Sequence, residues 1–161
     1  MSKIILGIDP GIADTGFGVI EFFSHSKMTS LDYGSIKTPA GQDLEKRLLQ
    51  LSLELEKIFK RYKPQILAIE QLFFNKNIKT ALTVAQARGV VMLFAAKHSL
   101  EVQSYTPLQI KQSVSCYGQA QKMQVQKMVK LILGLKVLPK PDDAADALAA
   151  AICASSTLKF K

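Results

Sequence analysis

Cysteine is scarce in this sequence. Cys116 and Cys153 are its only two cysteines, and no histidine lies near either one in a metal-binding pattern. Zinc sites built from cysteine and histidine need several such residues at short, regular spacings, so a site of this kind is excluded. A disulfide is disfavoured in a chain that we expect to be cytosolic. We interpret both cysteines as ordinary half-buried thiols, and we assign no role to the isolated His25 and His98.

Long hydrophobic runs are also missing. A helix that crosses a lipid bilayer needs about 20 consecutive apolar residues, and no run of that length occurs. The chain start leads directly into a strand-like segment, without the long apolar stretch and cleavage site of a signal peptide. Repeats, low-complexity segments and linkers are absent as well. We therefore expect a cytoplasmic protein that acts away from membranes and forms a single domain over residues 1–161.

Two common nucleotide-binding motifs are absent. The sequence has no Gly-x-x-x-x-Gly-Lys-Ser/Thr, so a P-loop nucleotide hydrolase is not indicated. The stretch Gly16-Phe17-Gly18 lacks the third glycine of a dinucleotide fingerprint, and it lies in an apparent strand instead of opening a helix.

Acidic residues are outnumbered by basic ones. The chain has 21 Lys and Arg against 13 Asp and Glu, a formal net charge of +8. Such a surplus favours a polyanionic partner such as nucleic acid, because binding releases counterions. A surplus that only keeps the protein soluble explains the charge equally well, so charge alone leaves both interpretations open. A membrane surface is disfavoured, since no basic amphipathic helix with exposed aromatic residues stands out.

The order of apolar patterns predicts an α/β protein, in which a mixed five-stranded sheet is flanked by helices on both faces. Strands are expected over 3–9, 15–23, 28–37, 65–70 and 101–105, and the first three form an antiparallel meander. Helices are expected over 43–62, 78–97, 106–116, 119–133 and 141–155. In the helix over 119–133, Val125 and Val129 are expected to point inward, with Lys122 and Gln126 on the polar side.

The helix expected over 78–97 is apolar on most of its sides. Leu82, Val90, Met92 and Leu93, among others, do not fit one stripe. A helix buried on two sides needs two packing partners. A second subunit would supply one of them, so homodimerisation is a hypothesis; the alternative is a central helix wrapped by its own chain.

Four acids lie at the ends of predicted elements. Asp9 and Glu70 each close an apolar strand, whereas Asp143 and Asp146 lie at the start of the last helix. Residues three apart on a helix share a face, so these two side chains lie together. The helix dipole also favours acids there, and Asp142 could be the N-cap, so capping is a serious alternative for this pair.

A metal site explains all four acids better than capping does. Two carboxylates about 4 Å apart repel each other by roughly 4 kcal/mol at an intermediate effective dielectric, and a bound cation removes that cost. A ligand set made only of oxygen selects Mg²⁺ or Mn²⁺ over softer metals. Two such ions support phosphodiester hydrolysis, so a basic protein with this site is a candidate nuclease. A metal-free structural cluster is the weaker alternative.

Four sequence motifs resemble the RuvC family of Holliday junction resolvases, and they cover nearly the whole chain in order. They are Ile4-Ile-Leu-Gly-Ile-Asp-Pro-Gly-Ile-Ala-Asp-Thr-Gly-Phe-Gly-Val19, taken loosely, Ala68-Ile-Glu-Gln-Leu-Phe73, Ala85-Gln-Ala-Arg-Gly-Val90 and Asp143-Ala-Ala-Asp-Ala-Leu148. The resemblance implies a ribonuclease H-like fold and a homodimeric endonuclease that uses two Mg²⁺ per active site, with Mn²⁺ able to substitute. It further implies symmetric cutting of four-way DNA junctions in recombination and repair, together with a RuvA–RuvB branch-migration complex.

The resemblance also implies roles for individual residues. Asp9, Glu70, Asp143 and Asp146 match the metal-binding catalytic acids of the family. Phe73 matches an aromatic residue that stacks on a base, and Lys111 and Lys122 match basic residues that contact DNA. One departure is Asp142, an extra acid directly before Asp143 that helical geometry would also allow as a ligand.

Further DNA contacts are expected around the second acid. Phe74 could share the stacking of Phe73, and an aromatic residue at a site rim can stack on an unpaired base. Lys76, Lys79 and Arg88 are additional candidates, for which an ordinary surface position is the alternative.

Two other functions fit parts of the sequence. The start Gly7-Ile8-Asp9-Pro10-Gly11 resembles the phosphate loop of actin-like ATPases, but those proteins close two lobes around ATP and this chain has room for one. A junction-binding module without catalysis is disfavoured, because every matched acid is present.

Overall fold

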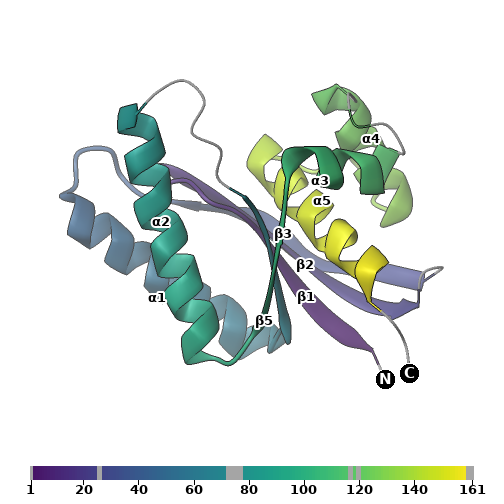
Figure 1. Ribbon diagram of the computed structural model, residues 1–161, viewed down its shortest axis with the longest axis horizontal. Helices are drawn as coiled ribbons and strands as arrows, with labels where there is room; N and C mark the ends of the chain where they lie inside the picture. Colours follow the sequence, from purple (N-terminus) through teal and green to yellow (C-terminus); the bar gives the residue numbers. More distant parts are fainter. Residues whose placement is uncertain (1, 25–26, 72–77, 116–117, 119–120, 159–161) are drawn as a thin grey trace.

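The computed structural model describes residues 2–24, 27–71, 78–115, 118 and 121–158, without the side chains of residues 78 and 79. Its centre is one five-stranded sheet with the strand order β3-β2-β1-β4-β5 (Figure 1). The first three strands form an antiparallel meander, and β4 and β5 run parallel to β1. The strands are β1 (Lys3–Asp9), β2 (Asp14–Ser24), β3 (Lys27–Lys37), β4 (Ile66–Glu70) and β5 (Glu101–Tyr105). The predicted mixed sheet is therefore confirmed.

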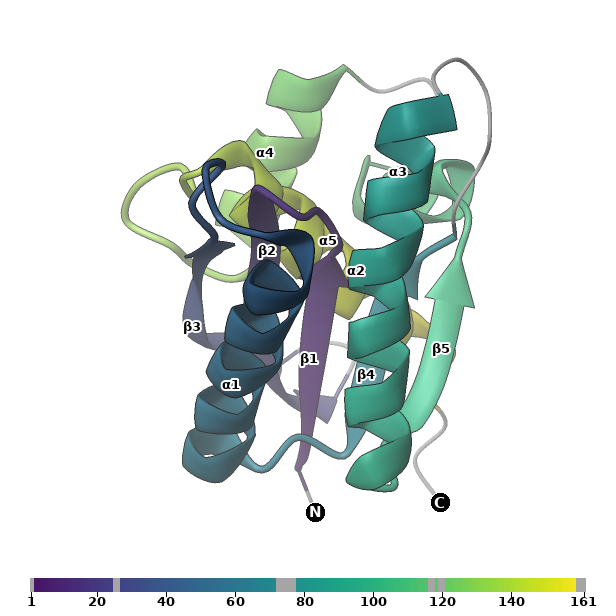
Figure 2. The ribbon, with the colours of Figure 1, turned by 90° about the vertical axis from the view of Figure 1, so that its left-hand side faces the viewer.

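Five helices among the described residues cover the two faces of the sheet. They are α1 (Leu44–Tyr62), α2 (Ile78–Lys97), α3 (Pro107–Ser115), α4 (Lys122–Ile132) and α5 (Asp142–Thr157). The pair α1 and α2 covers one face, and α5 lies on the other with α3 and α4 beside it (Figures 1 and 2). No helix of the described part is long and apolar enough to cross a membrane.

Alternation along the central strands decides which residues face α5. In β1, Leu6 and Ile8 pack among the residues of α1 and α2, whereas Ile5 packs in the core on the α5 side. Successive side chains of a strand point to opposite faces, so Gly7 and Asp9 also face α5. The same alternation in β4 puts Glu70 on the α5 face.

Helix α5 lies unusually close to β1 and β2, because glycine on the strands meets alanine and backbone on the helix. A Cβ atom added at Gly7 would overlap the carbonyl of Ala147, and one added at Gly16 would overlap the carbonyl of Asp143. Glycine inside a strand often marks such a close approach of another backbone. We name this contact of Gly7 and Gly16 with α5 the glycine seat.

Local sequence signals account for several element ends. Thr106 and Gln109 form a reciprocal pair at the start of α3, in which each side chain accepts a hydrogen bond from the other residue's backbone N–H. Gly134 follows α4 with a positive φ of 63°, and the N–H of Leu135 donates to the carbonyl of Lys130. This is a Schellman end, which glycine adopts without steric cost.

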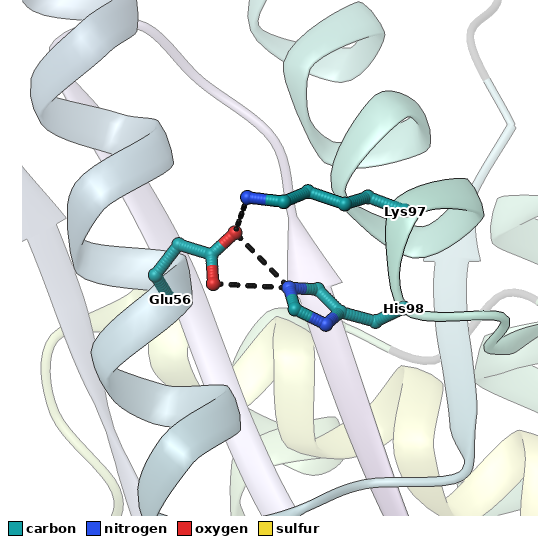
Figure 3. A network of polar contacts seen from close by, with 3 residues as sticks. All are labelled: Glu56, Lys97 and His98. Atoms are coloured by element: carbon teal, nitrogen blue, oxygen red, sulfur yellow. Dashed lines mark hydrogen bonds and ion pairs between the residues drawn. The ribbon is translucent and has the colours of Figure 1, made fainter.

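The helices α1 and α2 are joined at one end by a charged contact (Figure 3). Nζ of Lys97 lies 2.8 Å from Oε1 of Glu56, and Nε2 of His98 lies 3.0 Å from Oε2 of the same carboxylate. The His98 ring also stacks on Phe59, with ring centroids 3.8 Å apart. His98 therefore has a structural role that the sequence did not indicate.

The structure describes one of the two cysteines. Cys153 is buried in α5 as a free thiol, more fully than expected. Cys116 and His25 lie outside the described residues.

Candidate active site

The four predicted acids lie where β1, β4 and α5 meet. Asp9 ends β1 and Glu70 ends β4, and these strands are parallel neighbours with Ile8 beside Ile69. Their last side chains therefore lie next to each other on the α5 face. Asp143 and Asp146 come from the start of α5, and the glycine seat under the carbonyl of Asp143 lets this end of the helix approach the sheet.

Three of the acids form a compact group. Asp9, Asp143 and Asp146 each place one carboxylate oxygen within 4.8 Å of the other two, and all three side chains are half-buried. We name this set the three-acid group. Glu70 stands at its edge, where burial and then the charge of Asp146 raise the pKa of Glu70. The structure thus brings together all four acids that the sequence singled out.

Electrostatics in the group favour a cation. The pKa of Asp9 is raised from its ordinary value of 3.8 to about 8. Burial is the main cause, and the negative charges of Asp146, Asp143 and Glu70 add to it. A half-buried oxygen set that retains a proton near neutral pH fits a hard divalent ion, which would take the place of that proton.

Two lysines offset part of this negative charge. Burial raises the pKa of Glu70 and of Asp146, and the ammonium of Lys111 opposes the rise in both. Lys122 opposes it at Asp146. Glu70, Asp146 and both lysines line a pocket of about 270 Å³, whose other lining residues are Pro107, Ile110, Val125 and Ala149. The two lysines singled out in the sequence therefore lie at the acids.

Asp142 engages α4 and does not cap its own helix. Pro141 occupies the N-cap position of α5, and the cap makes no side-chain hydrogen bond. One oxygen of Asp142 lies 3.1 Å from Nζ of Lys122, and the other accepts a 2.8 Å hydrogen bond from Nε2 of Gln126. The expectation that Gln126 lies on the polar side of its helix is wrong, because the residue is only 7% exposed and its amide donates to Asp142.

The remaining DNA-contact candidates are less defined. Phe73, Phe74 and Lys76 lie outside the described residues, as does the side chain of Lys79. Arg88 is half-buried in α2, and its Nη2 donates a 3.3 Å hydrogen bond to Oγ of Ser104. The roles expected for all five remain predictions.

Sequence reasoning missed three residues that shape the site. Gly7 and Gly16 set the height of α5 over the strands, and Gln126 fixes the carboxylate of Asp142. A signal existed for the glycines, since glycine is disfavoured inside strands and often marks the close approach of another backbone. Gln126 gave no signal, because a glutamine four residues after Lys122 is ordinary on a helix surface.

Comparisons with known proteins agree on one family. The sequence profile described as "Crossover junction endodeoxyribonuclease RuvC" matches residues 5–154. The protein of that name from Ruminiclostridium cellulolyticum is 57% identical over 150 residues, which span 93% of this chain and 90% of the relative. The one from Clostridioides difficile is 52% identical over 158 residues, 98% of this chain and 93% of the relative.

Solved structures give the same result. T. thermophilus RuvC in complex with Holliday junction substrate has a TM-score of 0.89 and 34% identity, over 94% of this chain and 92% of that one. The expected ribonuclease H-like fold is confirmed by this match. The profile, the relatives and the fold all agree, and the chain belongs to the RuvC family of crossover junction endodeoxyribonucleases.

Proposed function

We propose that the protein is an endonuclease that resolves four-way DNA junctions by hydrolysing phosphodiester bonds during homologous recombination and DNA repair. The observation that carries this proposal is the three-acid group, with Glu70, Lys111 and Lys122 beside it, in a chain of this family. The T. thermophilus relative was solved with a Holliday junction substrate, which supports the same substrate here.

The acids are proposed to hold divalent cations. Asp9, Asp143 and Asp146 would share one ion, and Glu70 at the edge of the group supports a second. Mg²⁺ is the proposed ion and Mn²⁺ its substitute, because all the donors are carboxylate oxygens. When bound, such ions supply Lewis acidity that activates water and stabilises the leaving oxygen of a phosphodiester.

The lysines are proposed to act on the DNA strand. Lys111 and Lys122 line the pocket next to Glu70 and Asp146, so their ammonium groups can bind phosphate oxygens at the acids. Positive charge held there also stabilises the charge that develops on phosphate during hydrolysis. Phe73, Phe74, Lys76 and Lys79 are retained as proposed contacts to bases and backbone around the crossover.

A homodimer is proposed to place two active sites on one junction. Support for it comes from α2, where Leu93 is 70% and Leu82 57% exposed, so the described part of the chain leaves these two side chains uncovered. These leucines lie eleven residues apart, three helical turns, so they share one face. Two sites related by two-fold symmetry would cut two strands of like polarity. Cooperation with a RuvA–RuvB branch-migration complex and a cytoplasmic location are further proposals from the family.

Cleavage of a synthetic four-way junction in Mg²⁺ tests the proposed function. The wild-type protein should cut the junction in paired nicks and leave a linear duplex of the same sequence intact. Asp143→Asn should still bind the junction, but its cleavage should fall by at least about a hundredfold, as for the loss of one preorganised electrostatic group. Product mapping at nucleotide resolution identifies the paired positions.

Asp43→Asn is the matched control for this experiment. Asp43 precedes α1, is exposed and pairs with Lys46, so it is an acid at a helix start that is not one of the four proposed ligands. Its loss should leave cleavage unchanged. Wild-type protein that binds junctions but cuts none of several sequences with either metal would instead indicate a junction-binding module without catalysis.

A further inference from the structure

We propose that Asp142 is a positioning residue that holds Lys122 at the rim of the three-acid group, and that Asp142 is not itself a metal ligand. The proposal rests on the cleavage activity proposed above. It assigns a function to an acid beside the group that is not one of the four proposed metal ligands.

The carboxylate of Asp142 joins α5 to two positions of α4. Lys122 and Gln126 lie four residues apart and so share one face of α4. Oδ2 of Asp142 lies 3.1 Å from the Lys122 ammonium, and Oδ1 accepts the 2.8 Å hydrogen bond from the Gln126 amide. Both oxygens are thus occupied by α4, whereas the metal-binding arrangement of the group uses Asp9, Asp143 and Asp146.

Gln126 fixes the direction of this contact. Its side chain is nearly buried, so its amide has little access to water and relies on Asp142 as its acceptor. Asp142 is also the first residue of α5, next to the residue whose carbonyl lies on Gly16. The backbone at Asp142 is therefore positioned by α5 and its carboxylate by Gln126, so the carboxylate offers Lys122 an anchor.

The anchor determines where the ammonium of Lys122 stands. Nζ lies 3.1 Å from Asp142 and 3.8 Å from Asp146, so it is shared between a residue outside the three-acid group and one inside it. A cation bound to Asp146 would weaken the second contact by charge repulsion. Asp142 would then retain the ammonium at the rim, where it can meet a phosphate oxygen without the cost of ordering a flexible side chain.

The test is the single-turnover cleavage rate of Asp142→Asn at saturating junction and Mg²⁺. Asparagine keeps an oxygen for Gln126 but removes the charge that anchors Lys122. The rate should fall about fivefold, the scale of one partly exposed charge pair. Asp142→Glu, which retains the charge, should recover the rate to within about twofold. Asp43→Asn is the control, since its side chain is 61% exposed against 58% for Asp142 and it also pairs with a lysine.

A double-mutant cycle shows whether the effect passes through Lys122. In a Lys122→Ala background the further change Asp142→Asn should slow cleavage less than about twofold. An equal slowing in both backgrounds would mean that Asp142 only joins α4 to α5, and it would overturn the proposal. No slowing in the wild-type background would overturn it too.

Metal binding and folding provide readouts that do not depend on cleavage. Mn²⁺ affinity measured by calorimetry should stay within about threefold in Asp142→Asn, whereas Asp143→Asn should lose most of it. A loss as large as that of Asp143→Asn would make Asp142 a ligand and refute the positioning role. Urea unfolding should match that of Asp43→Asn. Failure of the wild-type protein to cleave would count against the proposed function and not against this role alone.

Discussion

Asp9 is the residue at which a proton and a metal ion compete. Its pKa of about 8 results first from burial and then from three neighbouring acids. An acid whose pKa is higher in the folded state than in the unfolded chain binds its proton more tightly when folded. Its contribution to stability in the metal-free protein is therefore full below about pH 4 and is lost as the pH rises towards 8.

Metal affinity should follow the opposite trend. Because a carboxylate must lose its proton to bind a cation, Mn²⁺ or Mg²⁺ affinity should rise by up to about tenfold per pH unit and level off near pH 8. Calorimetric titration at several pH values between about 6 and 9 measures this. Thermal unfolding with and without metal at the same pH values should show stabilisation by metal that grows with pH.

Asp9→Asn is the informative variant for this effect. It removes the proton that competes with the metal, so the remaining affinity, although weaker, should depend much less on pH. An affinity of the wild-type protein that is constant between about pH 6 and 8 would contradict a proton on Asp9.

At the scale of single residues, the sequence was sufficient to predict the four acids but not the residues that surround them. Asp9 and Glu70 stand out because each ends a strongly apolar strand, and Asp143 and Asp146 because their spacing puts them on one helical face. The inward turn of Gln126 was missed. Its burial depends on Asp142, a residue on another helix, and such a contact leaves no trace in local periodicity.

Among the helices and strands, α5 has the largest effect on the geometry of the site. Its buried face is rich in alanine, and it meets Gly7 and Gly16 of two strands. These small residues let the start of the helix approach the end of β1. The distance between Asp9 and the acids of α5 is therefore set by backbone contact.

Gly16→Ala should disturb this arrangement. The added methyl group would overlap the carbonyl of Asp143, so the start of α5 must move away from β2. We expect a loss of about 1–3 kcal/mol in the free energy of unfolding, as for overpacking in a core. Cleavage should fall by about a hundredfold, because displacements near 1 Å cost that much in a positioned site. Urea unfolding and the junction cleavage rate measure the two effects.

Gly41→Ala is the control for this variant. No atom lies within 4 Å of a Cβ placed at Gly41, so stability and cleavage should both be unchanged. Wild-type cleavage by Gly16→Ala would show that α5 can shift without moving its acids, and the glycine seat would then be irrelevant to the site.

Several element bounds were predicted well because they depend on local signals, although α4 begins at Lys122, three residues later than predicted. Apolar periodicity predicted the bounds of α1 and α2 to within one residue. Thr106 correctly marked the beginning of α3, and Gly134 marked the C-terminal end of α4. The glycine seat was not predicted, since it requires knowing that α5 crosses β1 and β2. That contact joins residues more than a hundred positions apart in the chain.

At the scale of the whole molecule, α2 offers a surface through which two copies would associate. One side of α2 packs on the sheet through Ala87, Val91 and Phe94, while Leu82 and Leu93 remain exposed. Between them Gly89 leaves open space at the helix surface, with no atom within 4 Å of its added Cβ. An apolar face with a gap at its centre suits close packing against another helix.

Leu93→Glu should therefore produce a monomer. A buried carboxylate without a partner is costly, so self-association should weaken at least about 30-fold, the scale of one interface hot spot. Sedimentation at micromolar concentration measures the oligomeric state. Leu131→Glu is the matched control, because Leu131 is 73% exposed on α4 and its replacement should leave the dimer intact. A wild-type protein that sediments as a monomer would refute the dimer.

The layered fold could be predicted from the order of strands and helices. The surface through which two copies would associate could not. Alternating strand and helix patterns limit the sheet to few topologies. The sequence of α2 showed that it was apolar on more than one side. Only the structure shows that the second side, with Leu93, is open to a partner.

The glycine seat has a mechanical consequence for the DNA. The backbone of Gly16 packs closely against the backbone carbonyl of Asp143. Neither group has side-chain rotamers through which the contact could relax. The start of α5, which carries Asp143 and Asp146, is therefore rigid, and we expect the DNA junction to deform on binding. Curving a short duplex stores on the order of 1–6 kcal/mol as elastic energy. A strand strained in this way would recoil when it is nicked, and the recoil would carry the new ends away from the acids.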